Sequence, residues 1–217
     1  MIEAQVNRSK SFNSDVFASQ ELYRLVLQSL SRPGEIQHLS KNILEGLSLN
    51  QETSMSSNVY IDALALMVLD PKIGFYLPQK FLEAAKAGFY AKRQSAFASA
   101  DQADIIFMPA LDDCETDTIL QAKAGTLFDP HCSASVFVAL QRLSDTAGAE
   151  TPHQIILKGP GIKDKNTVFV SSLEAFQARQ ERNDEYPCGI DMIFVDRNGN
   201  LFALPRTTEL CIVRGDK

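Results

Sequence analysis

The fold of this chain is decided by residues 192–204, which read MIFVDRNGNLFAL. Two apolar runs, Met192 to Val195 and Leu201 to Leu204, flank a polar stretch that contains the pair Asn198-Gly199. Asn and Gly tolerate the positive φ angles of a tight hairpin turn. The stretch therefore predicts two antiparallel strands that lie next to each other.

Upstream of this hairpin, short apolar runs with the length of strands alternate with helical or turn-rich segments. The runs that we interpret as strands are residues 35–39, 74–77, 105–108, 135–140, 154–157 and 168–170. Such alternation is typical of α/β proteins with a parallel sheet, and the hairpin adds an antiparallel strand. The sequence therefore predicts an α/β fold with a mixed sheet.

Several helices have recognisable ends. Ser14-Asp15 can cap a first helix, which should end at Ser31-Arg32-Pro33-Gly34, because Pro33 disfavours an α conformation at the residue before it. Asn58 can cap an apolar helix over residues 59–69. Residues 172–182 have the pattern of an amphipathic helix. The polar stretch 41–57 is expected to be irregular.

Length and composition fit one domain. The chain has 217 residues, of which 45% are hydrophobic and 22% charged, enough to bury a core without disulfides or metals. We expect a single domain over residues 15–217, preceded by a flexible leader at residues 1–14. The formal charge of −6 argues against a nucleic-acid or anionic-membrane partner. No apolar run resembles a membrane span or a secretion signal, so we expect a cytoplasmic protein.

Familiar catalytic and nucleotide-binding motifs do not occur. The chain lacks GxxxxGK[ST], a GxGxxG after a strand, and GxSxG. Its cysteines, Cys114, Cys132, Cys188 and Cys211, form no CxxC pair, and we expect them to be buried free thiols.

The remaining polar groups give no clear reactive centre. His131 and Cys132 are adjacent, but adjacency alone does not align an imidazole with a thiol. A metal site from His131, Asp129 and Asp112 or Asp113 is conceivable, yet the intervals match no ligand pattern. We therefore expect no catalytic, cofactor-binding or metal-binding residue.

One segment could bind an anion. Arg206, Thr207 and Thr208 follow a predicted strand, where a guanidinium and two hydroxyls could hold a phosphate, phosphonate or carboxylate group. The alternative is an Arg206 that pairs with an acid such as Asp191 on the neighbouring hairpin arm. The turn Gly159-Pro160-Gly161 could add backbone N–H donors, although Pro160 has none.

The ends of the chain resemble the PhnH family of phosphonate metabolism. The similar segments are Tyr23-Arg24 through Ser29-Leu30-Ser31-Arg32-Pro33-Gly34, Leu157-Lys158-Gly159-Pro160-Gly161-Ile162, Tyr186-Pro187 with Gly189-Ile190-Asp191, and Pro205-Arg206-Thr207-Thr208. In the middle, Gly125-Thr126 and Pro130 are also similar, although His131 stands where an acidic residue is more usual. Their order spans nearly the whole chain.

The resemblance implies a three-layer α/β/α fold with a mixed sheet, related to pyridoxal-phosphate-dependent transferases but without the cofactor. Consistent with that absence, Lys158 ends a strand but has no evident Asp partner for a pyridine nitrogen. The resemblance also implies a complex with the PhnG, PhnI and PhnJ subunits of carbon–phosphorus lyase. That complex forms ribose 1-alkylphosphonate 5-triphosphate from an alkylphosphonate and a nucleoside triphosphate.

Two functions from different classes remain open. The first is an accessory subunit without catalytic residues of its own, in a complex of the ribose 1-methylphosphonate 5-triphosphate synthase type. The isolated chain could then also form a symmetric homodimer. The second is an oxyanion-binding enzyme or ligand sensor that uses Arg206, Thr207, Thr208, Gly159 and Gly161.

Overall fold

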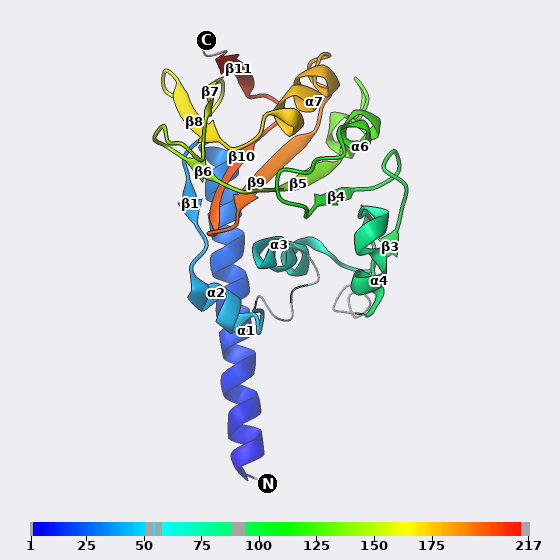
Figure 1. Cartoon of the computed structure of the whole chain (residues 1–217). Helices are drawn as coiled ribbons and strands as arrows, with labels where there is room; N and C mark the ends of the chain where they lie inside the picture. The colour runs from blue at the N-terminus through cyan, green and yellow to red at the C-terminus, as the bar shows by residue number, and fades with distance from the viewer. Residues whose placement is uncertain (1, 51–53, 55–57, 88–93, 214–217) are drawn as a thin grey trace.

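A mixed sheet forms the centre of the protein. The computed structural model describes residues 2–50, 54, 58–87 and 94–213, and within them seven strands pair in the order β1-β10-β9-β5-β4-β2-β3 (Figure 1). These strands are β1 (Gln37–His38), β2 (Gly74–Tyr76), β3 (Ala96–Phe97), β4 (Ile105–Met108), β5 (Ser135–Leu140), β9 (Asp191–Asp196) and β10 (Asn200–Leu204). The predicted α/β fold with a mixed sheet is confirmed.

The predicted hairpin belongs to the antiparallel part of this sheet, which also includes β1 on the other side of β10. β10 pairs with β9 in the register Leu201↔Val195 to Leu204↔Met192, whereas β9, β5, β4, β2 and β3 are parallel neighbours. At the turn the positive φ falls on Gly199, at 86°, and not on Asn198. The turn therefore needs the left-handed conformation at one residue only.

A second, antiparallel sheet was not predicted as a separate unit. In the described residues it has the order β11-β7-β8-β6, with β6 (Leu143–Ser144), β7 (His153–Lys158), β8 (Asn166–Val170) and β11 (Glu209–Val213). β11 escaped prediction because it follows the polar Arg206 segment closely. It pairs with β7 in the register Glu209↔Lys158 to Val213↔Gln154.

The helices are placed partly as expected. They are α1 (Ile2–Ser31), α2 (Lys41–Gly46), α3 (Val59–Val68), α4 (Gln79–Ala87), α6 (Thr116–Gln121) and α7 (Glu174–Arg182), with the 3-10 turn η1 (Pro130–Cys132). Asn58 caps α3, since its Oδ1 accepts the N–H of Tyr60 at 2.9 Å. This cap confirms the prediction for that helix.

Two expectations about helices were wrong. α1 begins at Ile2, so it starts well before the expected cap at Ser14-Asp15; the flexibility of residues 1–14 stays a prediction. The stretch expected to be irregular contains α2, which buries Ile43 and Leu44 in the core. Burial of these side chains against α1 and α3 outweighs the polar local sequence. Residues 51–53 and 55–57 of that stretch lie outside the described residues.

The central sheet is buried on both faces. Along β9, Ile193 and Val195 contact the core under α1, α2 and α3, while Met192 and Phe194 point to the opposite core. That second core lies under α6, α7 and the antiparallel sheet. The expected α/β/α layering therefore holds on one face, whereas the other face carries helices and strands together.

Aromatic stacking fixes the position of α7. The ring of Phe176 lies 4.3 Å from that of Phe194 in β9, at an interplanar angle of 9°. The ring of Phe194 in turn lies 5.1 Å from that of Phe202 in β10. This stack sets α7 on the sheet near the end of β10, where the predicted anion-binding segment begins.

None of the described helices is long and apolar enough to cross a membrane.

Candidate anion-binding site

The structure brings together the two segments that were predicted to bind an anion, the turn Gly159-Pro160-Gly161 and the segment Arg206-Thr207-Thr208. The pairing of β7 with β11 places the turn after β7 beside the segment before β11. Gly159 has φ 137°, and a Cβ atom there would lie 3.0 Å from the carbonyl oxygen of Thr207. Segments about fifty residues apart in the sequence thus meet in one turn cluster.

A third segment packs against this cluster. Gly161 has φ 83°, and a Cβ atom there would lie only 2.3 Å from the carbonyl oxygen of Ser31. Nearby, the Nδ2 of Asn166 donates to the carbonyl oxygen of Pro33 at 2.7 Å. The end of α1 is therefore held against the Gly159 to Gly161 turn.

Arg206 is paired inside the protein. Its Nη2 lies 3.1 Å from Asp191 Oδ2, its backbone N–H donates to Asp191 Oδ1 at 2.7 Å, and its Nη1 donates to the carbonyl oxygen of Pro130. The Asp191 pairing left open by the sequence is thus present. These contacts tie the start of β9 and the 3-10 turn to the Arg206 segment.

Arg179 in α7 was not predicted as a site residue. Its side chain is 2% exposed, and its Nη2 donates to the carbonyl oxygens of Pro205 at 2.6 Å and Thr208 at 3.0 Å. Burial lowers the pKa of the guanidinium to about 10, opposed by the nearby Asp191 carboxylate. The Nε atom is buried and has no hydrogen-bond partner among the described residues.

The sequence did contain one indication of Arg179. It lies three residues after Phe176 and four after Ala175, both of which are buried on the inner face of α7. Residues at these spacings share one helix face. A charged residue on an apolar stripe needs an internal partner or ligand, and this spacing could have identified it.

Several of these residues line a common pocket of about 500 Å³. Its walls include Pro160, Arg179, Arg206, Thr207 and Thr208. The Oγ1 of Thr208 is buried and, among the described residues, has no hydrogen-bond partner. The rest of the wall comes from Gln180, Asn183, Asp184, Tyr186, Glu209 and Leu210.

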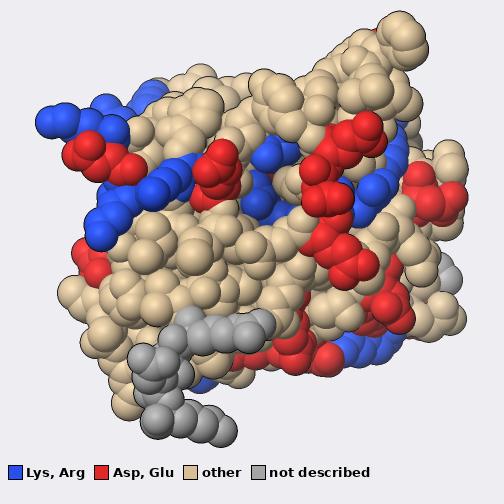
Figure 2. All heavy atoms as spheres, turned by 90° about the horizontal axis from the view of Figure 1, so that it is seen from above, with Lys and Arg blue, Asp and Glu red and all other residues tan. Residues whose placement is uncertain are grey.

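Figure 2 views the end of the molecule on which α7 and β11 lie. Basic and acidic side chains alternate across this face and do not separate into two areas. A ligand here would therefore be selected by a few placed groups, because no broad field of one sign covers the face.

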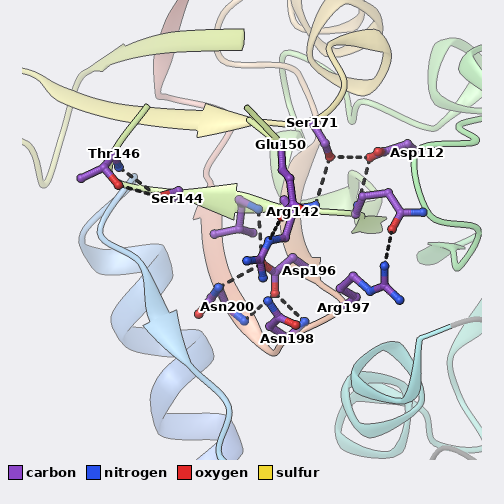
Figure 3. Close-up of polar contacts among 12 residues, drawn as sticks. Asp112, Arg142, Ser144, Thr146, Glu150, Ser171, Asp196, Arg197, Asn198 and Asn200 are labelled. Carbon is purple, nitrogen blue, oxygen red and sulfur yellow. Dashed lines mark hydrogen bonds and ion pairs between the residues drawn. The ribbon is translucent and has the colours of Figure 1, made fainter. Parts of the chain in front are cut away.

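A second polar cluster surrounds Asp196 at the turn between β9 and β10 (Figure 3). Asp196 is fully buried. Its Oδ1 accepts the backbone N–H of Asn198 at 2.8 Å and of Asn200 at 2.9 Å. Its Oδ2 accepts the backbone N–H of Leu143 at 3.2 Å and the Nδ2 of Asn200 at 3.0 Å. The carboxylate therefore joins the hairpin turn to the start of β6.

Asp112 lies at the carboxyl ends of the parallel strands β4 and β5, beside the Asp196 cluster (Figure 3). Its φ is 54°, in the left-handed region. Its Oδ1 accepts the Ser171 hydroxyl at 2.7 Å and the backbone N–H of Gln141 at 3.1 Å. With Arg142 and Arg197 it lines a cavity of about 680 Å³. Carboxyl ends of parallel strands often bind ligands, but here each positive side chain has a partner, Arg142 with Glu150 and Arg197 with Gln141.

The other reactive side chains are dispersed. Cys132 and Cys211 are exposed, and Cys114 and Cys188 are half-buried, so the expectation of buried thiols was wrong. Cys132 lies in the 3-10 turn, none of whose residues is buried, and Cys211 lies in β11 at the edge of the antiparallel sheet. His131 is exposed in the 3-10 turn. Within the described residues, no group of three or more His, Cys, Asp or Glu side chains is arranged to hold a metal ion.

Fold and site together define the class: a mixed α/β protein with a pocket that includes a buried arginine. Comparison with known families narrows this class. The model of the bacterial phosphonate metabolism protein (PhnH) family matches residues 10–211. This chain therefore belongs to the PhnH family, and its role lies in phosphonate metabolism. No curated protein matches the chain.

Proposed function

We propose that this protein is an accessory subunit of the carbon–phosphorus lyase core complex, together with PhnG, PhnI and PhnJ. The complex would form ribose 1-alkylphosphonate 5-triphosphate, with the phosphonate replacing the base of a nucleoside triphosphate at the ribose. The observation that carries this proposal is the family match over residues 10–211. In this role the chain supplies binding surface, and the catalytic groups come from other subunits.

The surface of α1 supports such a role. Its N-terminal half extends away from the rest of the molecule (Figure 1). Four apolar side chains are exposed among the residues of this helix whose burial is described, 15–31, namely Val16, Phe17, Tyr23 and Leu27, with Phe17 68% exposed. Val16, Tyr23 and Leu27 follow the spacing of one helix face. An exposed apolar stripe on a helix is a surface that a partner chain can cover.

Co-purification tests this proposal. We expect the tagged chain to retain PhnG, PhnI and PhnJ when all four are co-expressed. Leu27→Ser should weaken retention, whereas Gln20→Ser, also at an exposed position of α1, should not. The proposal fails if the wild-type chain never co-elutes with these subunits and cells use phosphonates normally after its deletion.

Three further parts of this proposal have their own tests. A cytoplasmic location is tested by cell fractionation, and a homodimer of the isolated chain by light scattering. The relation to pyridoxal-phosphate-dependent transferases, without the cofactor, predicts no shifted Schiff-base absorbance when pyridoxal phosphate is added. Lys158, which is exposed at the end of β7, is the lysine that such a band would implicate.

A second candidate function is oxyanion binding by the pocket that Arg206, Thr207 and Thr208 line. The observation that favours it is the convergence of this segment with the Gly159 to Gly161 turn. Calorimetric titration of the isolated chain with phosphonates tests it. No binding at millimolar concentration would exclude this second function and leave the subunit role intact.

A further inference from the structure

The charge of Arg179 has no bonded counter-ion. Both of its hydrogen bonds use Nη2 and end on carbonyl oxygens. Among the described residues neither Nε nor Nη1 has a partner. A buried cation without an acid bonded to it is costly, because burial removes its hydration. The side chain thus has hydrogen-bonding capacity left for a ligand.

The acid near Arg179, Asp191, is already bonded to Arg206. Asp191 accepts both the backbone N–H and Nη2 of Arg206. Arg179 and Arg206 together carry two positive charges against the single charge of Asp191. Among these three charges, the positive charge without a bonded acid therefore belongs to Arg179 rather than to Arg206.

Hydroxyl groups complete the donor set. Thr207 is exposed at the pocket. Thr208 also lines the pocket, and its Oγ1 is buried and has no partner among the described residues. A guanidinium beside hydroxyls suits an oxygen-rich anion, since several acceptor oxygens can be satisfied at once. A tetrahedral oxyanion offers more such oxygens than a carboxylate.

We infer that this pocket binds the phosphonate or phosphate group of a small molecule, with Arg179 as the charged ligand residue and Thr207 and Thr208 as hydroxyl donors. The inference rests on the second candidate function above and identifies its cation and ligand class. Arg206 then acts as a positioning residue, because its guanidinium is held by Asp191 and Pro130.

Two acidic side chains at the rim of the pocket should weaken anion binding. Asp184 and Glu209 line the same pocket and are exposed. Their charges oppose an incoming anion, although solvent and salt screen this repulsion. Glu209→Gln should therefore tighten anion binding, and the gain should diminish as salt is added.

Titration of the full chain tests the assignment. Methylphosphonate and inorganic phosphate should both bind, whereas acetate should bind at least about tenfold more weakly. ATP serves as a separate arm, because binding of ATP without binding of either small anion would overturn the ligand class. Arg179→Met should weaken methylphosphonate binding at least about tenfold.

A matched variant controls for loss of an arginine from α7. Arg182 lies on the same helix, and its Nε donates to the carbonyl oxygen of Ala122 at 2.6 Å. It does not line the pocket, so Arg182→Met should leave affinity unchanged. Equal effects of Arg179→Met and Arg182→Met would overturn the assignment of Arg179. No binding by the wild-type chain would instead remove the second candidate function itself, and the inference with it.

A second measurement avoids dependence on a variant that fails to fold. Wild-type crystals soaked with selenate should show an anomalous peak in the pocket within hydrogen-bond reach of Arg179. A peak that methylphosphonate displaces supports the inference. A peak elsewhere, or none while calorimetry detects binding, overturns it.

Discussion

Arg206 and Asp191 are joined twice, through the backbone N–H of Arg206 to Oδ1 at 2.7 Å and through Nη2 to Oδ2 at 3.1 Å. Both side chains are about one-fifth exposed, so water screens the pair less than it screens a surface ion pair. The pair connects the start of β9 to the segment that leads into β11. It therefore sets the shape of the pocket wall.

A double-mutant cycle measures this connection. Asp191→Asn and Arg206→Met should each lower the free energy of unfolding, and their coupling energy should be about 1–2 kcal/mol. Urea denaturation of the four proteins gives the value. A coupling energy near zero would mean that the pair does not hold the segment.

Gly161 should not tolerate a side chain. Its φ is 83°, and a Cβ atom would lie 2.3 Å from the carbonyl oxygen of Ser31. Gly161→Ala should therefore cost about 3 kcal/mol or more, from the strained φ and the displaced backbone.

Gly148 offers the control for this substitution. It is exposed, and its Cβ would meet only the Thr151 hydroxyl, at 3.4 Å. Gly148→Ala should change the unfolding free energy by no more than about 0.5 kcal/mol. Similar midpoints for the two variants in thermal denaturation would contradict the contact between the Gly161 turn and the end of α1.

The buried carboxylate of Asp196 should contribute strongly to stability. It accepts four hydrogen bonds, from Leu143, Asn198 and twice from Asn200. Asp196→Ala leaves these donors without their acceptor and should cost at least about 3 kcal/mol. Asp145→Ala, at an exposed position after β6, is the control and should be close to neutral. Equal denaturation midpoints would show that the network adds nothing.

The cysteines should differ in reactivity. Burial, with the acids Glu174, Glu115 and Asp113 nearby, raises the pKa of Cys114 from 9.0 to about 12. The thiolate is the reactive form, so at pH 8 iodoacetamide should modify Cys114 at least about tenfold more slowly than the exposed Cys132 and Cys211. Mass spectrometry of the alkylated peptides measures these rates. In urea all four cysteines should react alike, and a fast Cys114 in the folded protein would refute the prediction.

The same pKa shift has a consequence for stability. Because the pKa of Cys114 is raised on folding, the neutral thiol is favoured in the folded state. Its contribution is fully present below pH 9 and is lost as the pH rises from 9 towards 12. Cys114→Ser should therefore reduce the loss of unfolding free energy between these two pH values.

Local sequence patterns predicted the central strands well. Residues 105–108 and 135–140 are strands at the predicted boundaries, because strands buried on both faces are continuous apolar runs. The hairpin of β9 and β10 was predicted for a related reason, since its turn residues adjoin the strands that they connect. Weak elements such as β6 and β11 depend on pairing partners far along the chain, and their local sequence is short or half-exposed.

The candidate site was predictable only in part. Arg206, Thr207 and Thr208 were identified because they follow a strand, and the structure places them in one pocket with Pro160. The pairing of Arg206 with Asp191 was one of two alternatives. Arg179 was missed, because its contacts with Pro205 and Thr208 span 26 and 29 residues.

The sequence by itself determined the mixed α/β class, the buried strands and the family, since these follow from local apolar patterns and from motifs in order along the chain. Only the tertiary structure decided which guanidinium is paired with an acid, that of Arg206, and which is not, that of Arg179. The physical reason is that charge compensation depends on distances in space. For example, the contact of Arg206 with Pro130 joins residues that are 76 positions apart in the sequence. No local sequence pattern covers such a separation.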